Sequence, residues 1–103
     1  MRRPIAALAA VAGLALAAGP VLAQDAARYM AANCANCHGT DGQGAGAGGM
    51  PGLAGLSRTY FIEQINAFRS GARQATIMHQ IAKGYTDEQI GQLADFFSKQ
   101  KSK

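Results

Sequence analysis

The sequence has few of the features that mark common functional classes. Only two of its 103 residues are cysteines, so no framework of several disulfides stabilises it. Its net charge is only +4, without a dense basic face and interleaved aromatics, which excludes a nucleic-acid-binding role. It has no internal repeat, and no segment alternates apolar and polar residues over the length of a strand. We therefore predict one small all-α domain.

The longest apolar stretch lies at the amino terminus, where residues 5–18 follow Arg2 and Arg3. Small residues precede Gln24, at the positions that a signal peptidase reads. This arrangement is typical of a signal peptide over residues 1–23, and it predicts export to the periplasm with no membrane span after cleavage. An uncleaved anchor is the alternative, although the stretch is short for a span and rich in weakly apolar alanine.

The remaining domain, residues 24–103, is small enough that a bound cofactor would help to stabilise it. Residues 26–33 are rich in helix formers and lead into the cysteines. Residues 39–55 are rich in glycine and are predicted to form a loop. A helix is expected between a cap at Ser57 and a stop at Gly71, with apolar residues at helical spacing.

Two more helices are predicted near the carboxyl terminus. Residues 76–84 are expected to form a short one. A longer helix over residues 87–100 is preceded by Thr86, which has capping-box spacing to Gln89. Its apolar positions form one stripe at helical spacing, Ile90, Leu93, Ala94 and Phe97.

The two cysteines are followed directly by a histidine, in the order Cys34-Ala-Asn-Cys37-His38. A thioredoxin-type dithiol would need a neighbouring βαβ unit, which the sequence does not predict. A structural zinc site usually takes its ligands from two separated pairs, and here only His79 is left to complete the set. A disulfide is compatible with export but leaves His38 without a role.

The pattern C-x-x-C-H is the attachment signature of haem c. The two thiols add to the vinyl groups of the porphyrin, and the histidine binds the iron as its proximal ligand. Export agrees with this interpretation because such attachment takes place outside the bacterial cytoplasm. We therefore expect one covalent haem c, attached to Cys34 and Cys37, with His38 as an iron ligand.

An electron-carrying haem iron needs a second axial ligand on its other face. The candidates are Met30, Met50, Met78 and His79. Met30 lies on the helix before the motif, where a methionine usually serves packing, and Met50 follows His38 closely. Met78 lies past a full predicted helix, so the chain has room to reach the opposite face. Met78 is preferred to His79, which would give a bis-histidine iron.

Residues 24–103 resemble a class I cytochrome c in the order of a helix, the cysteine motif, a glycine-rich loop and Pro51-Gly-Leu53-Ala-Gly-Leu. The resemblance implies the class I cytochrome c fold, in which short helices surround one haem and the last helix crosses the first. It implies that the Pro51 carbonyl accepts a hydrogen bond from Nδ1 of His38, which fixes the ring. It also implies that Leu53 packs on the haem and that Met50 lies on the His38 side.

The segments FRSGAR and ATIMHQIAKGYTDEQIGQLADFFSKQK resemble the cytochrome subunit of flavocytochrome c sulfide dehydrogenases. In that family the methionine of the TIM segment is an axial ligand, and it corresponds to Met78. The resemblance implies an electron-transfer protein rather than an enzyme, acting as the subunit or acceptor of a flavoprotein sulfide dehydrogenase. Such subunits often have two haem domains, whereas this sequence has one motif.

Two alternatives to this function remain, the first of them within the same electron-transfer class. A free electron carrier of the c-553 type would serve other respiratory or photosynthetic partners. A haem peroxidase would need an open distal site and an acid–base group, for which His79 is the candidate.

Overall fold

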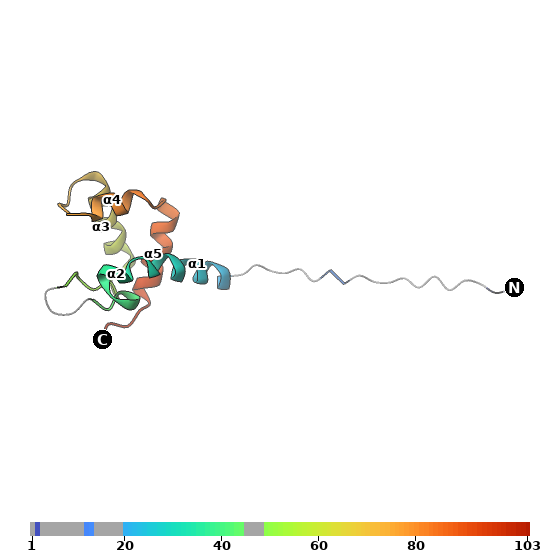
Figure 1. The fold of residues 1–103 in the computed structure, drawn as a ribbon. Coiled ribbons are helices and arrows are strands. Elements are labelled where there is room, and N and C mark those ends of the chain that lie inside the picture. The colour runs from blue at the N-terminus through green and yellow to red at the C-terminus, as the bar shows by residue number, and fades with distance from the viewer. Residues whose placement is uncertain (1, 3–11, 14–19, 45–48) are drawn as a thin grey trace.

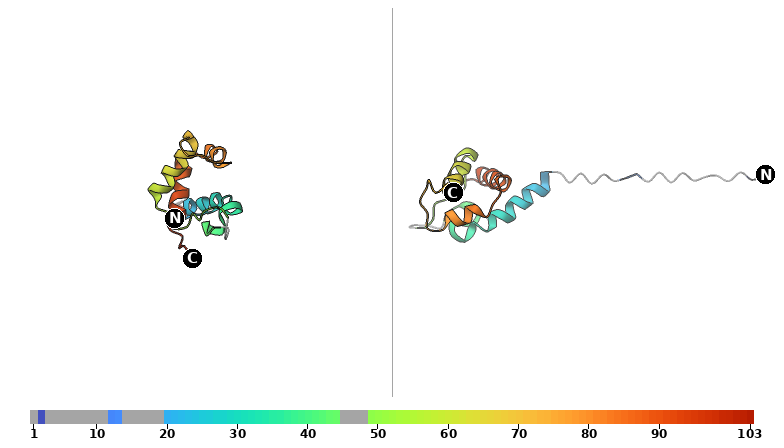
Figure 2. Two further views of the ribbon diagram at one scale, coloured as in Figure 1. Left: turned by 90° about the vertical axis from the view of Figure 1, so that its left-hand side faces the viewer. Right: turned by 90° about the horizontal axis from the view of Figure 1, so that it is seen from above.

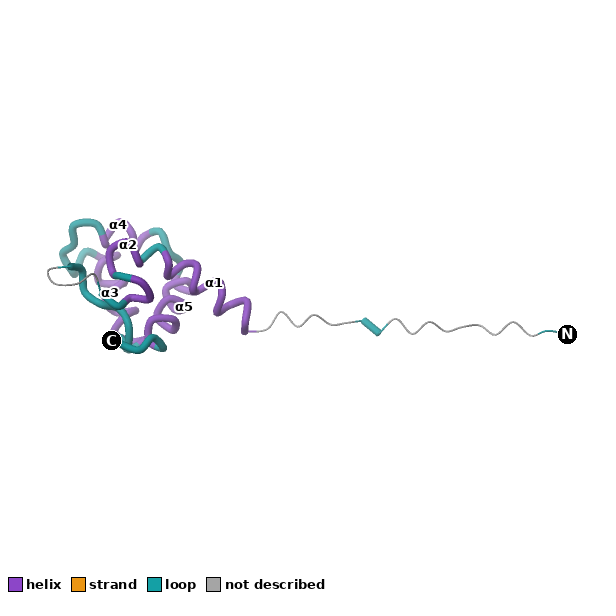
Figure 3. Tube along the Cα trace, turned by 60° about the horizontal axis from the view of Figure 1, so that its bottom comes forward, coloured by secondary structure: helices purple, strands orange, loops and turns teal. Residues whose placement is uncertain are grey.

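The structure is a computed structural model that describes residues 2, 12–13, 20–44 and 49–103. Most of the predicted signal peptide lies outside these residues, so its cleavage stays a prediction. The described part of the chain consists of helices and loops and contains no strand (Figure 1, Figure 3). The prediction of an all-α chain is thereby confirmed for these residues.

The elements follow in the order α1 (Pro20–Ala32), α2 (Ala35–His38), the 3-10 helix η1 (Thr40–Gly42), α3 (Arg58–Ser70), α4 (Met78–Lys83) and α5 (Asp87–Ser98). The four predicted helices are present, although α1 begins earlier than residue 26. The prediction of a continuous loop over residues 39–55 is wrong at η1, and α2 was not predicted. Both elements are single turns, too short to produce a hydrophobic period.

Local capping signals determine where α3 and α5 begin. The Ser57 hydroxyl accepts a hydrogen bond from the Tyr60 N–H at 3.2 Å, and Gly71, with φ of 82°, ends α3. The Thr86 hydroxyl accepts from the Gln89 N–H at 3.1 Å, while the Gln89 side chain accepts from the Thr86 N–H at 2.9 Å. This reciprocal pair is the capping box that the sequence predicts.

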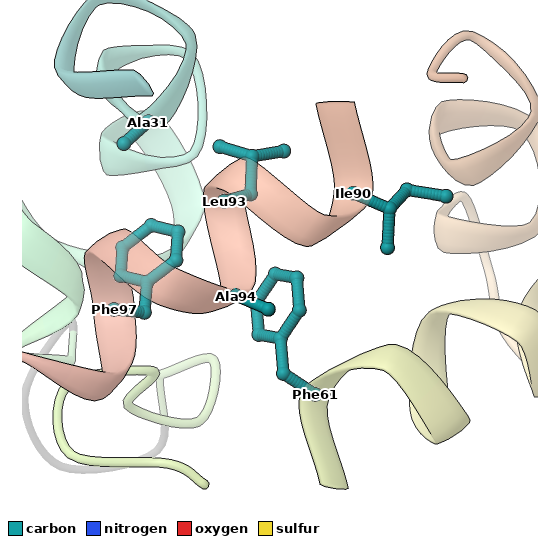
Figure 4. Packing of buried hydrophobic residues seen from close by; sticks show 6 residues of the cluster. All are labelled: Ala31, Phe61, Ile90, Leu93, Ala94 and Phe97. Carbon is teal, nitrogen blue, oxygen red and sulfur yellow. The ribbon is translucent and has the colours of Figure 1, made fainter. Parts of the chain in front are cut away.

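The hydrophobic core is centred on α5 (Figure 4). Its predicted stripe is fully buried, with exposed fractions of 3% or less at Ile90, Leu93, Ala94 and Phe97. The ring of Phe61 from α3 stacks on Phe97 with 5.7 Å between the ring centroids, and Ala31 of α1 belongs to the same cluster. Side chains of α5 therefore hold α1 and α3 together.

Helix α5 also contacts or adjoins, near its two ends, two segments that carry candidate site residues. At its amino end α5 follows α4 after a short turn, and near its carboxyl end the Phe97 carbonyl accepts a hydrogen bond from the Gly55 N–H at 2.9 Å. Figures 1 and 2 show α4 and α2 on the same side of α5, one near each end. Because α5 is about 18 Å long, it separates the turn that ends at His38 from the helix that begins at Met78.

Candidate functional site

A single helical turn holds the cysteine motif. The carbonyl of Cys34 accepts hydrogen bonds from the His38 N–H at 2.8 Å and from the Cys37 N–H at 3.2 Å. Both cysteines are free thiols, Cys34 half-buried and Cys37 exposed. This turn therefore carries two thiols and one imidazole within five consecutive residues.

The environment of the thiols argues against two of the alternatives for this motif. Burial raises the pKa of the Cys34 thiol, and the neighbouring Cys37 raises it further. A redox-active dithiol needs a lowered pKa to form its attacking thiolate, so Cys34 is poorly suited to that chemistry. Within the described residues, no three His, Cys, Asp or Glu side chains lie together in a group able to hold a metal ion. Among the described residues, His79 therefore does not complete a zinc site with Cys34, Cys37 and His38.

The imidazole of His38 is held by a backbone group. His38 is only 9% exposed, and its Nδ1 lies 2.7 Å from the carbonyl oxygen of Pro51. Because a carbonyl can only accept, we assign the proton to Nδ1, which leaves the lone pair of Nε2 free. The structure thus contains the hydrogen bond expected from the resemblance, and it prepares His38 to bind a metal through Nε2.

Backbone hydrogen bonds in the described part of the glycine-rich loop bring Pro51 to the histidine. The Gly44 N–H donates to the His38 carbonyl at 2.7 Å, and the Gly42 carbonyl accepts from the N–H groups of Leu53 and Ala54 at 2.7 and 2.9 Å. A Cβ atom at Gly42 would lie 2.8 Å from a ring carbon of Phe97, and φ is +75° there. Only glycine fits this position without strain. The sequence predicted a glycine-rich loop here but not these contacts.

One polar side chain links this loop to the carboxyl-terminal residues. The Gln43 side chain donates to the Lys101 carbonyl at 2.8 Å and accepts from the Lys103 N–H at 3.0 Å. No short-range pattern could predict this contact, because the residues that it joins are about sixty positions apart.

The candidates for a second axial ligand occupy different environments. Met30 packs against the core cluster, as expected for a structural methionine. Met50 is 53% exposed and directly precedes Pro51, whereas Met78 is half-buried at the first position of α4. Nδ1 of His79 is buried and is the one such side-chain nitrogen or oxygen among the described residues without a hydrogen-bond partner. Leu53 is half-buried against the core cluster, and its contact with haem stays a prediction.

The donor set fits covalently attached haem. Two free thiols and an imidazole with an available Nε2 lie on one turn, in the order that haem attachment requires. The family model described as Cytochrome c matches residues 23–101. The chain belongs to the cytochrome c family. It therefore carries covalent haem c, and Cys34 and Cys37 belong to its attachment motif.

A solved structure supports the fold of this cytochrome c. Cytochrome c4 of Acidithiobacillus ferrooxidans is similar at 38% sequence identity and a TM-score of 0.62. The match covers 79% of this chain and 49% of that chain, so this cytochrome spans about half the length of the matched structure. A search of the curated proteins finds no match. The predicted class I cytochrome c fold is confirmed by the family match and this neighbour.

A helix that spans a membrane needs about 20 consecutive, mostly apolar residues. Among the described residues, no helix is both long enough and apolar enough to cross a bilayer.

Proposed function

We propose that this cytochrome c is a one-electron carrier in which His38 and Met78 bind the haem iron. The hydrogen bond between Nδ1 of His38 and the Pro51 carbonyl carries the proposal, because it leaves Nε2 free and fixes the plane of the ring. Haem iron that is ligated on both faces changes between the ferrous and ferric states and so accepts and releases single electrons.

The position of Met78 supports its role as the second ligand. It begins α4, which lies on the same side of α5 as α2 but near the other end (Figure 2). Met50 precedes the residue that is hydrogen-bonded to His38, so it belongs to the proximal side. A methionine thioether opposite a histidine favours the ferrous state, which suits an electron acceptor.

Apolar surface around Met78 gives further support. Ile77 is 53% exposed and Ile81 is 38% exposed, although both are large aliphatic residues. A small domain that exposes neighbouring apolar side chains usually covers them with a ligand or a partner. In the proposed carrier, these two side chains exclude water from the iron ligand, while the core around Phe97 keeps the His38 turn fixed.

Substitution of the methionines tests the ligand assignment. Met78→Ala should remove the weak red-edge absorption that ferric iron shows with a sulfur ligand, and Met50→Ala should leave it unchanged. The measurement is the absorption spectrum of the purified ferric protein. If the band survives in Met78→Ala, another residue is the ligand. If the unchanged ferric protein lacks the band, no sulfur atom binds the iron, and the spectrum of His79→Ala then shows whether the neighbouring imidazole is the ligand.

We propose that the protein is located in the periplasm. Its proposed partner is a flavoprotein sulfide dehydrogenase, of which this chain is the cytochrome subunit or from which it accepts electrons. The leader pattern of residues 1–23 and the TIM segment around Met78 support this assignment. A hollow of about 680 Å³ beside α4 is lined by Arg69, Arg73 and Lys83, and such positive charge favours an acidic partner surface. The alternative is a free carrier of the c-553 type.

Purification from the native cell decides whether the protein is the subunit of a complex or a free carrier. A complex that contains flavin together with this cytochrome supports the subunit, whereas elution as a single small protein without flavin supports the free carrier. Mass spectrometry of the periplasmic fraction tests export at the same time. A mature chain that starts at Gln24 is the expected product.

A further inference from the structure

The segment that presents Met78 has few contacts of its own to hold it. It begins at Gly71, where α3 ends, and reaches α4 at Ile77, whose φ of −140° and ψ of −23° are not helical. No side chain caps the start of α4. With six residues, α4 is also too short to be stable by itself. The position of Met78 must therefore depend on contacts to the rest of the fold.

Arg73 makes such contacts at three points, all with α3. Its N–H donates to the Ala67 carbonyl at 3.0 Å, and its Nη1 donates to Oε1 of Gln64 at 2.6 Å. Its guanidinium carbon lies 4.6 Å from the centre of the Phe68 ring. One residue in the middle of the linking segment is thus attached by its backbone, by a hydrogen bond and by a cation–π contact.

Two other arginines form ion pairs, and their contacts differ from those of Arg73. Arg69 donates to Asp87 at 2.6 Å, and Arg58 donates to Asp95 at 2.8 Å, so each joins α3 to α5. Among the described residues, neither arginine forms a side-chain hydrogen bond with residues 71–77, the linking segment. Arg73 therefore differs from them in tying the segment itself to a core helix.

We propose that Arg73 is a positioning residue for Met78, which it holds in place by fastening residues 71–77 to α3. This inference rests on the proposed role of Met78 as an iron ligand. An arginine suits the task because its planar guanidinium can stack on Phe68 while one edge donates to Gln64. A lysine keeps the charge but cannot make both contacts in this geometry.

Displacement of the methionine by added imidazole measures how often the segment opens. The haem-loaded ferric protein is titrated with imidazole, and loss of the red-edge band reports exchange of the sulfur ligand. Arg73→Gln should strengthen apparent imidazole binding about tenfold, because a hydrogen bond and a cation–π contact that oppose opening are lost. Arg73→Lys should fall between Arg73→Gln and the unchanged protein.

The matched control is Arg58→Gln, which removes an exposed arginine at the start of α3 whose ion pair with Asp95 does not involve the linking segment. Its imidazole affinity should stay within twofold of the unchanged protein. Denaturant unfolding of each variant separates local opening from global stability, since Arg73→Gln should change imidazole binding at an almost unchanged midpoint. Equal imidazole affinity in Arg73→Gln and Arg58→Gln overturns the proposal.

The two proposals fail in different ways. If Met78→Ala retains the red-edge band, the ligand assignment is wrong and the role of Arg73 falls with it. If Met78→Ala loses the band while Arg73→Gln and Arg73→Lys bind imidazole as the unchanged protein does, Met78 remains the ligand and only the positioning role is overturned.

Discussion

The carbonyl oxygen of Pro51 lies 2.7 Å from Nδ1 of His38, although the two residues are thirteen positions apart in the chain. The chain closes this distance through Gly42, whose carbonyl accepts hydrogen bonds from Leu53 and Ala54. Gly42 is in turn pressed against the ring of Phe97. The orientation of the proposed iron ligand thus depends on a glycine that does not touch it.

Gly42→Ala should therefore destabilise the protein strongly. The new methyl group would lie less than 3 Å from Phe97 and Leu53, and the alanine would have to adopt a positive φ. Together these two effects should cost about 3 kcal/mol of unfolding free energy. Denaturant unfolding measures this loss. Gly71→Ala is the control, because φ is also positive there but nothing lies within 4 Å, so only about 1 kcal/mol is expected. Equal losses in the two variants would contradict the tight contact at Gly42.

Thr86→Ala should remove one half of the capping box at the start of α5. The Gln89 N–H then loses its acceptor, and the unfolding free energy should fall by about 1 kcal/mol. Thr59→Ala changes an exposed threonine inside α3, and it should leave stability the same or slightly higher because alanine favours helices. A loss at Thr59 as large as that at Thr86 would argue against the cap.

The two cysteines should react at different rates in the haem-free chain. The raised pKa of Cys34 means that its thiolate forms only at more alkaline pH, whereas Cys37 is exposed. At neutral pH, iodoacetamide should label Cys37 first, and the preference should narrow as pH rises towards the pKa of Cys34. Mass spectrometry of cleaved peptides measures the order, and denaturant provides the control because it should abolish the difference. Labelling of Cys34 first would contradict its burial.

Local features of the sequence were sufficient for the helices that carry the core. Helix α3 begins after Ser57 and ends before Gly71, because helix caps and left-handed glycines act within a few residues. The stripe from Ile90 to Phe97 is buried because helical spacing places it on one face. The cofactor could also be predicted from the sequence, since haem attachment requires two cysteines and a histidine at a fixed spacing within five consecutive residues.

Other features could not be read locally. The 3-10 helix η1 ends at Gly42, whose carbonyl accepts hydrogen bonds from Leu53 and Ala54, residues that lie far beyond one helical turn in the chain. The contacts of Gln43 with the carboxyl-terminal residues and of Arg73 with Gln64 left no periodic signal, because each is a single side chain meeting one distant partner.

The sequence by itself determined the helical class, the caps of α3 and α5, the apolar face of α5 and the covalent haem, because each depends on residue types at short, fixed spacings. The resemblance to class I cytochromes c already implied the bond between Pro51 and His38, and only the tertiary structure decided how that bond is held and what fastens Met78. The Pro51 carbonyl reaches His38 and Arg73 fastens the Met78 segment because chain closure and packing bring them together. Such contacts depend on the path of the whole backbone, which short-range spacing does not encode.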